Sequence, residues 1–264
     1  MPFADVSGLR LFYTDEGSGE PAMLLVHGWS CDSHDWSWQI PAFAKDHRVI
    51  ASDLRGHGRS SVSADGYTPR SFAADLAELL SGCSAGPVVA IGHSLGAVIV
   101  SVLAVEHPEL IRAVVVVDSA YGIGAERKSS VAQLLQELRG PAGIELAAGL
   151  GARTAATPQG LETWHRRRVL GTPPDVMADT LAGIYQTDDQ IGFQPESDQY
   201  LRRRACPVLG IYADQSRAIW EATTHEHPYS RQVAWDGSGH WLHQERSAEF
   251  NSLVLDWIGG LPSH

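Results

Sequence analysis

The chain has 264 residues, 44% of them hydrophobic, and its formal net charge is −11 at pH 7. This length allows one large domain with a substantial core, and the acidic balance argues against nucleic acid and anionic membrane surfaces as partners. No apolar run approaches the ~20 residues that cross a bilayer, and the first residues lack a basic segment followed by an apolar one, so we expect neither a membrane span nor a signal peptide.

Short apolar runs alternate with helical patterns along most of the chain. Residues 8–14 alternate polar and apolar side chains, which is typical of a half-buried strand. Runs that predict further strands lie at 22–26, 49–51, 88–91, 113–117, 208–212 and 231–235, and helical spacing marks 71–80, 95–106 and 248–258. Runs that are apolar on both faces fit parallel strands covered by helices on each side, so the pattern predicts an α/β fold.

The alternation stops between about residues 122 and 204. Helical patterns near 129–139, 143–150, 159–170 and 174–186 replace it, and no strongly β-type run appears. We therefore expect a helical cap, 122–204, inserted into a core domain made of 1–121 and 205–264. Two arginine triplets, 166–168 and 202–204, are interpreted as exposed helix faces or the base of this cap rather than an anion site.

Residues 92–96 read Gly-His-Ser-Leu-Gly between a strand-like run and a helix-forming run. In that context the motif predicts a sharp strand–turn–helix elbow that exposes the serine hydroxyl at the strand end. Small residues are needed on both sides of the turn because the strained backbone leaves no room for side chains. Ser94 is therefore the candidate nucleophile.

A nucleophilic serine needs a base, a group that orients the base, and donors for the developing oxyanion. His240 is the candidate base because it follows the last predicted strand and a glycine-rich turn. The backbone N–H groups of Trp29, after a His-Gly strand end, and Leu95, at the helix start, are the candidate oxyanion donors. For the acid, chain order leaves Asp118 and Asp214, each of which follows a predicted strand.

These segments, together with 53–60 and 237–240, resemble the α/β-hydrolase superfamily over essentially the whole chain. The resemblance implies an eight-stranded, mostly parallel sheet with a helical lid after the sixth strand. Most members carry the acid after the seventh strand, but their pattern places Ser216 at that position in this chain. Some branches carry it after the sixth strand, where Asp118 stands, so the resemblance favours Asp118 over Asp214.

The expected function is hydrolysis of a carboxylic ester or lactone of a bulky apolar or aromatic small molecule, through an acyl-enzyme on Ser94. The alternative is a cofactor-free dioxygenase that cleaves a hydroxyquinolone-type ring with His240 and Asp118. Residues 29–32 and 227–229 faintly resemble that branch, whereas Cys31 and Leu95 replace histidines that it tends to carry. A perhydrolase with the same triad and a small-molecule receptor that retains the triad also remain open.

The chain has eight tryptophans, and several adjoin the predicted site. We expect pocket walls from His27, Trp36, Trp164 and Trp241, because aromatic side chains suit a flat or apolar ligand. Paired cysteine spacing, zinc-ligand spacing and a dinucleotide-binding glycine motif are lacking, so we expect free thiols in a cytoplasmic protein, no metal and no cofactor. The sequence leaves the oligomeric state open.

Overall fold

The computed structural model describes residues 2–152 and 159–262. An eight-stranded sheet runs through the core in the order β1-β2-β4-β3-β5-β6-β7-β8. Only β1 with β2 and β2 with β4 pair antiparallel, and the other neighbours are parallel. The strands are β1 (Phe3–Val6), β2 (Leu9–Glu16), β3 (Met23–Val26), β4 (Val49–Ser52), β5 (Val88–His93), β6 (Ile111–Val117), β7 (Val208–Tyr212) and β8 (Arg231–Ala234).

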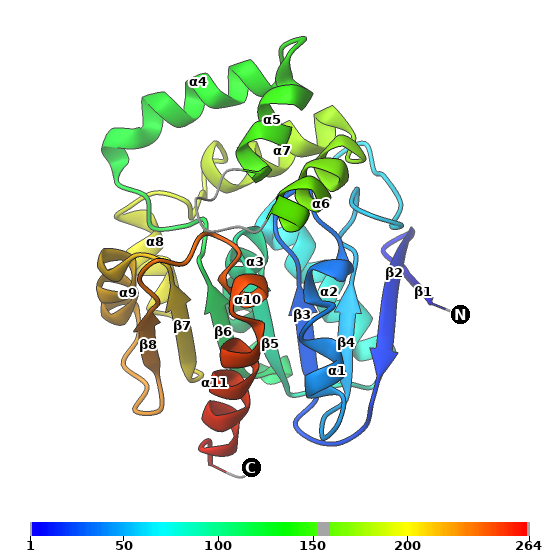
Figure 1. The fold of residues 1–264 in the computed structure, drawn as a ribbon, viewed down its shortest axis with the longest axis vertical. Helices are drawn as coiled ribbons and strands as arrows, with labels where there is room; N and C mark the ends of the chain where they lie inside the picture. Colours follow the sequence, from blue (N-terminus) through cyan, green and yellow to red (C-terminus); the bar gives the residue numbers. More distant parts are fainter. Residues whose placement is uncertain (1, 153–158, 263–264) are drawn as a thin grey trace.

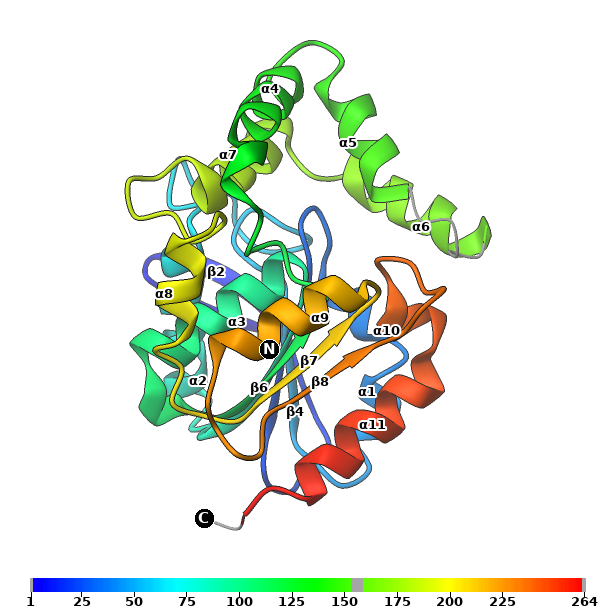
Figure 2. The same cartoon turned by 90° about the vertical axis from the view of Figure 1, so that its left-hand side faces the viewer.

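Helices cover both faces of this sheet (Figures 1 and 2). One face carries α2 (Pro69–Gly82), α3 (Leu95–Glu106) and α9 (Gln215–Glu221), and the other carries α1 (Ile40–Phe43), α10 (Leu242–Glu245) and α11 (Ser247–Gly259). Every residue of β3, β4 and β5 is buried, as their continuous apolar runs predicted. The predicted α/β fold with its mostly parallel sheet is confirmed.

Four helices that follow β6 lie above the carboxyl ends of the strands, and we call them the overlying helices (Figure 1). They share a small apolar core of their own that includes Leu135, Leu138, Val169 and Met177. The predicted cap also includes residues 153–158, which lie outside the described residues. The overlying helices are α4 (Lys128–Leu138), α5 (Gly143–Ala152), α6 (Gln159–Leu170) and α7 (Pro174–Tyr185).

The chain returns from α7 to the core through α8 (Glu196–Leu201), which lies beside the sheet rather than above it (Figure 2). Short 3-10 turns complete the described elements: η1 (Ser33–Trp36), η2 (Pro108–Leu110), η3 (Ala125–Arg127) and η4 (Ala222–Thr224). Within the described residues, none of the helices combines the length and apolar character required to cross a bilayer.

Candidate active site

Ser94 stands on the predicted sharp turn between β5 and α3. Its backbone lies at φ 52° and ψ −111°, a conformation that residues other than glycine rarely adopt. A Cβ atom at Gly92 would lie 2.2 Å from the Gly96 carbonyl oxygen, and one at Gly96 would lie 2.1 Å from that of Val26. Both positions therefore require glycine, and the turn presents Ser94 at the carboxyl end of the sheet.

His240 and Asp118 meet beside this turn. The Nδ1–H of His240 donates to Oδ2 of Asp118 at 2.6 Å, and Oδ1 of Asp118 accepts from the Ala213 N–H at 3.3 Å. Asp118 directly follows β6 and has a φ of 42°. Asp214 instead accepts from backbone N–H groups at the start of α9 and is exposed, so the structure brings Asp118 to His240 and not Asp214.

A cavity of about 110 Å³ joins Ser94 and His240. Its other lining residues are aromatic or apolar: Trp29, His93, Leu150 and Trp241. Of the predicted pocket walls, Trp241 lines the cavity, whereas Leu150 and His93 had not been predicted.

The two expected oxyanion donors flank the elbow. Leu95 is the first residue of α3, and Trp29 follows the turn at the end of β3. A Cβ at Gly28 would lie 3.0 Å from Nδ1 of His93, so glycine lets this turn approach the elbow closely. The indole N–H of Trp29 donates to the Met177 carbonyl oxygen on α7 at 2.9 Å, which ties the turn to the overlying helices.

The described lining of the cavity at Ser94 does not include the expected walls His27, Trp36 and Trp164. Trp36 is fully buried against the face of the sheet that carries α1, α10 and α11, with its ring centroid 4.7 Å from that of His243. His27 is also fully buried, and its Nε2 accepts from the Leu54 N–H at 3.0 Å, which joins the ends of β3 and β4. Trp164 packs edge to face on Trp38, with ring centroids 5.5 Å apart.

The sequence model of the protein family described as "alpha/beta hydrolase fold" matches residues 21–247, which is most of the chain. The chain belongs to the α/β-hydrolase fold family. The predicted family is thus confirmed. The sheet order, the elbow and the His240–Asp118 contact are therefore features of a member of this family.

Among curated relatives of this α/β hydrolase is the dihydrolipoyllysine-residue acetyltransferase component of the acetoin cleaving system of Cupriavidus necator, 28% identical over 98% of this chain and 69% of that protein. A soluble epoxide hydrolase from a Corynebacterium species is 36% identical over 46% of this chain, and the match spans 42% of its own length. The enol-lactonase structure from Burkholderia xenovorans LB400 has a TM-score of 0.84 at 22% identity, over 98% of this chain and 100% of that one. That likeness concerns the fold.

Buried histidines surround the site of this hydrolase. The Nε2–H of His93 donates to the His240 carbonyl oxygen at 2.9 Å, and burial holds the pKa of His93 well below its usual range. Burial likewise lowers the pKa of His243 to about 3, that of His57 to about 3 and that of His165 to about 4. These rings are therefore neutral in the folded protein at ordinary pH.

We expect these rings to make the fold acid-sensitive. Unfolded histidines take up protons below about pH 6.5, whereas folded His243 stays neutral to about pH 3. The unfolded state thus binds more protons between these values, and stability falls as the pH falls, by about 2 kcal/mol per such ring at pH 5. We expect the free energy of unfolding, measured with urea, to fall between pH 8 and pH 5 by about 2 kcal/mol less in His243→Phe than in the wild type.

His34→Phe controls for loss of a histidine at an exposed position. An equal loss of stability in the wild type and in His243→Phe would show that His243 does not carry this acid sensitivity.

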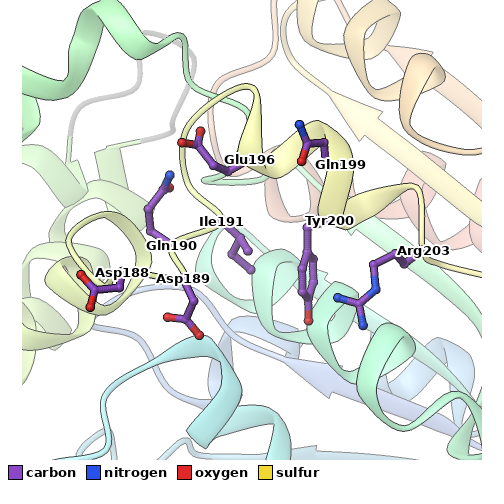
Figure 3. Close-up of a pocket in the computed structure, with 8 residues that line it drawn as sticks. All are labelled: Asp188, Asp189, Gln190, Ile191, Glu196, Gln199, Tyr200 and Arg203. Atoms are coloured by element: carbon purple, nitrogen blue, oxygen red, sulfur yellow. The ribbon is translucent and has the colours of Figure 1, made fainter.

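A second cavity, of about 320 Å³, opens between the segment after α7 and helix α8 (Figure 3). In its lining, Tyr200 donates to Glu106 at 2.7 Å, and Arg70 of α2 pairs with the same Glu106 at 2.9 Å. Asp189, at the cavity edge, also pairs with Arg70, at 2.5 Å. The cavity is larger than the one at Ser94 but lacks the elbow serine and His240, so we place the candidate active site at Ser94.

Proposed function

We propose that this chain hydrolyses a carboxylic ester or lactone with Ser94 as nucleophile, His240 as base and Asp118 as the acid that orients it. The observation that carries the proposal is the 2.6 Å hydrogen bond from His240 to Asp118 beside an elbow serine. A strained serine next to an imidazole whose tautomer is fixed by a carboxylate is the arrangement that activates a hydroxyl.

In the proposed reaction, Ser94 Oγ attacks the substrate carbonyl carbon while His240 Nε2 takes its proton. Asp118 holds the proton on Nδ1 and stabilises the imidazolium. The N–H groups of Trp29 and Leu95 stabilise the tetrahedral oxyanion, which collapses as His240 protonates the departing alkoxide. Water, deprotonated by His240, then attacks the acyl-enzyme, and Ser94 regains its proton when the acid is released.

The cavity favours a small, uncharged acyl group. Its volume is about 110 Å³, well below the roughly 300–1,000 Å³ of pockets that enclose a drug-sized ligand. Its described lining carries neither a carboxylate nor a lysine or arginine side chain, so a charged acyl group would lose its solvation there without a partner. A bulky substrate would have to keep its larger part outside this cavity, between the core and the overlying helices, which we propose act as a cap.

The relatives support hydrolysis as the reaction class. An enol-lactonase shares the fold over its whole length, and a curated relative over nearly the whole chain is named an acetyltransferase component. Both names describe acyl chemistry at a carbonyl carbon. Epoxide hydrolases also occur among the relatives, so epoxides are part of the test.

A substrate panel tests the proposal. We expect turnover of p-nitrophenyl acetate, propanoate and butanoate and of unsubstituted lactones, falling at least tenfold for the octanoate, with little turnover of p-nitrophenyl hemisuccinate. A fluorophosphonate probe should add its phosphonyl mass to the peptide that contains Ser94, because it reacts with activated serines. Epoxide turnover without ester turnover, or oxygen uptake with a hydroxyquinolone, would overturn the acyl-enzyme proposal.

A further inference from the structure

A buried carboxylate, Asp35, joins helix α6 of the overlying helices to the segment that follows His240. The side chain of Asp35 is fully buried on η1. Its Oδ1 forms a short ion pair with the guanidinium of Arg168 on α6 and accepts from Nε2 of Gln244 at 3.2 Å. The same Gln244 amide donates to the Asp35 backbone carbonyl at 3.1 Å. Because Gln244 lies on α10, four residues after His240, Asp35 contacts both partners at once.

The charges in this cluster compensate one another. Burial opposes ionisation of Asp35, but the Arg168 guanidinium holds its pKa below the usual value. Asp35 correspondingly raises the pKa of Arg168 against the effect of burial. The pair is thus ionised in a place where either charge alone would be costly, so α6 is held to the core at this point.

A second contact from α6 reaches the residue next to His240. The rings of His165 and Trp241 stack with centroids 3.6 Å apart and planes 13° apart. Trp241 directly follows His240 and lines the Ser94 cavity. The segment before His240 is glycine-rich: Gly237 has a φ of 81°, and the Gly239 N–H donates to Oε2 of Glu245 at 2.6 Å.

We propose that Arg168 and His165 are positioning residues that fix His240 from the overlying helices. From the core, Asp118 accepts the Nδ1–H of His240, and His93 donates to the His240 carbonyl oxygen. From the overlying helices, the Arg168–Asp35–Gln244 contacts and the His165–Trp241 stack hold the residues that follow. This inference rests on the proposed role of His240. It adds that the contacts of α6 with Asp35 and Trp241 are required to hold the His240 ring in its position beside Ser94.

Arg168→Met tests the ion pair, and Arg166→Met is the matched control. Arg166 lies on the same helix but pairs at 2.7 Å with Glu145 of α5, at an exposed position away from His240. We expect Arg168→Met to lower kcat about tenfold with KM within twofold, and Arg166→Met to leave both within twofold. His165→Ala should lower kcat about fivefold, and His165→Phe, which keeps an aromatic ring for the stack, should regain most of it.

A double variant separates positioning from stability. Arg168→Met leaves Asp35 buried without its partner and should lower Tm, whereas Asp35→Asn/Arg168→Met removes both charges and should regain most of that loss. We expect kcat to stay low in the double variant because the ionic contact from α6 to Asp35 is still missing. A kcat that recovers together with Tm, or a folded Arg168→Met enzyme with wild-type kcat, would overturn the proposal.

An NMR readout keeps this test independent of the proposed reaction. The Hε1 resonance of His240, assigned by its absence in His240→Ala, should shift or broaden in Arg168→Met and stay in place in Arg166→Met. An inactive wild type in which Arg168→Met still moves this resonance would reject the proposed hydrolysis and keep the positioning role. An unmoved resonance would reject the positioning role itself.

Discussion

Ser94→Ala is expected to abolish ester turnover, with kcat/KM falling at least about 10⁴-fold. The substitution removes the only atom that forms the acyl-enzyme in the proposed mechanism, while the elbow keeps its backbone and its two required glycines. Substrate binding should therefore change little, and labelling by the fluorophosphonate probe should disappear. Stopped-flow measurement of nitrophenol release would check the loss of the chemical step under single-turnover conditions and the absence of a burst with substrate in excess.

Ser84→Ala provides the control for this substitution. Ser84 has a comparable left-handed backbone, with a φ of 50°, but it is exposed in the segment that follows α2. Its loss should leave turnover within twofold. Substantial hydrolysis that remains in purified Ser94→Ala would show that another group attacks the substrate and would reject Ser94 as nucleophile.

The strands and the elbow could be predicted because their signals are local. Runs such as 88–91 are apolar on both faces, which fits a parallel strand covered on each side, and β5 is buried at every residue. The glycines at 92 and 96 reflect contacts between the elbow and its immediate surroundings. His240 could be proposed as the base for a similar reason, since a glycine-rich turn after the last strand is visible in the sequence.

The pocket walls were harder to predict because proximity in sequence does not decide which face a side chain takes. Trp36 is close in sequence to the oxyanion turn, yet it lies on η1 and packs against His243 and Phe250 on the face of the sheet that carries α11. His27 belongs to the turn itself but its ring is used in a hydrogen bond to the end of β4. Leu150, which does line the cavity, comes from a helix whose placement depends on tertiary packing.

The arginine triplets show the same limit. Both were expected on exposed helix faces or at the base of the cap, and the structure places the third member of each in a buried ion pair. Arg168 pairs with Asp35, and Arg204 pairs with Glu221 at 2.8 Å with neither side chain exposed. A carboxylate that is distant in sequence decides this burial, and no local pattern indicates which partner it is.

Asp118→Asn is expected to lower kcat by about 10³–10⁴-fold with little change in KM. An amide at this position can offer its N–H₂ to His240 Nδ1, which would favour the tautomer that carries its proton on Nε2. That tautomer cannot accept the Ser94 proton, and the imidazolium loses its counter-charge. Steady-state kinetics with p-nitrophenyl acetate would measure the effect.

Asp214→Asn is the matched comparison, because it makes the same chemical change at the other candidate acid. Asp214 accepts from the Ser216 N–H at 2.6 Å at the start of α9, a capping role that asparagine also fills. We therefore expect turnover within twofold and little loss of stability. The opposite ranking of the two variants would mean that the loop after β7 moves during catalysis and brings Asp214 to His240, in place of the carboxylate that follows β6.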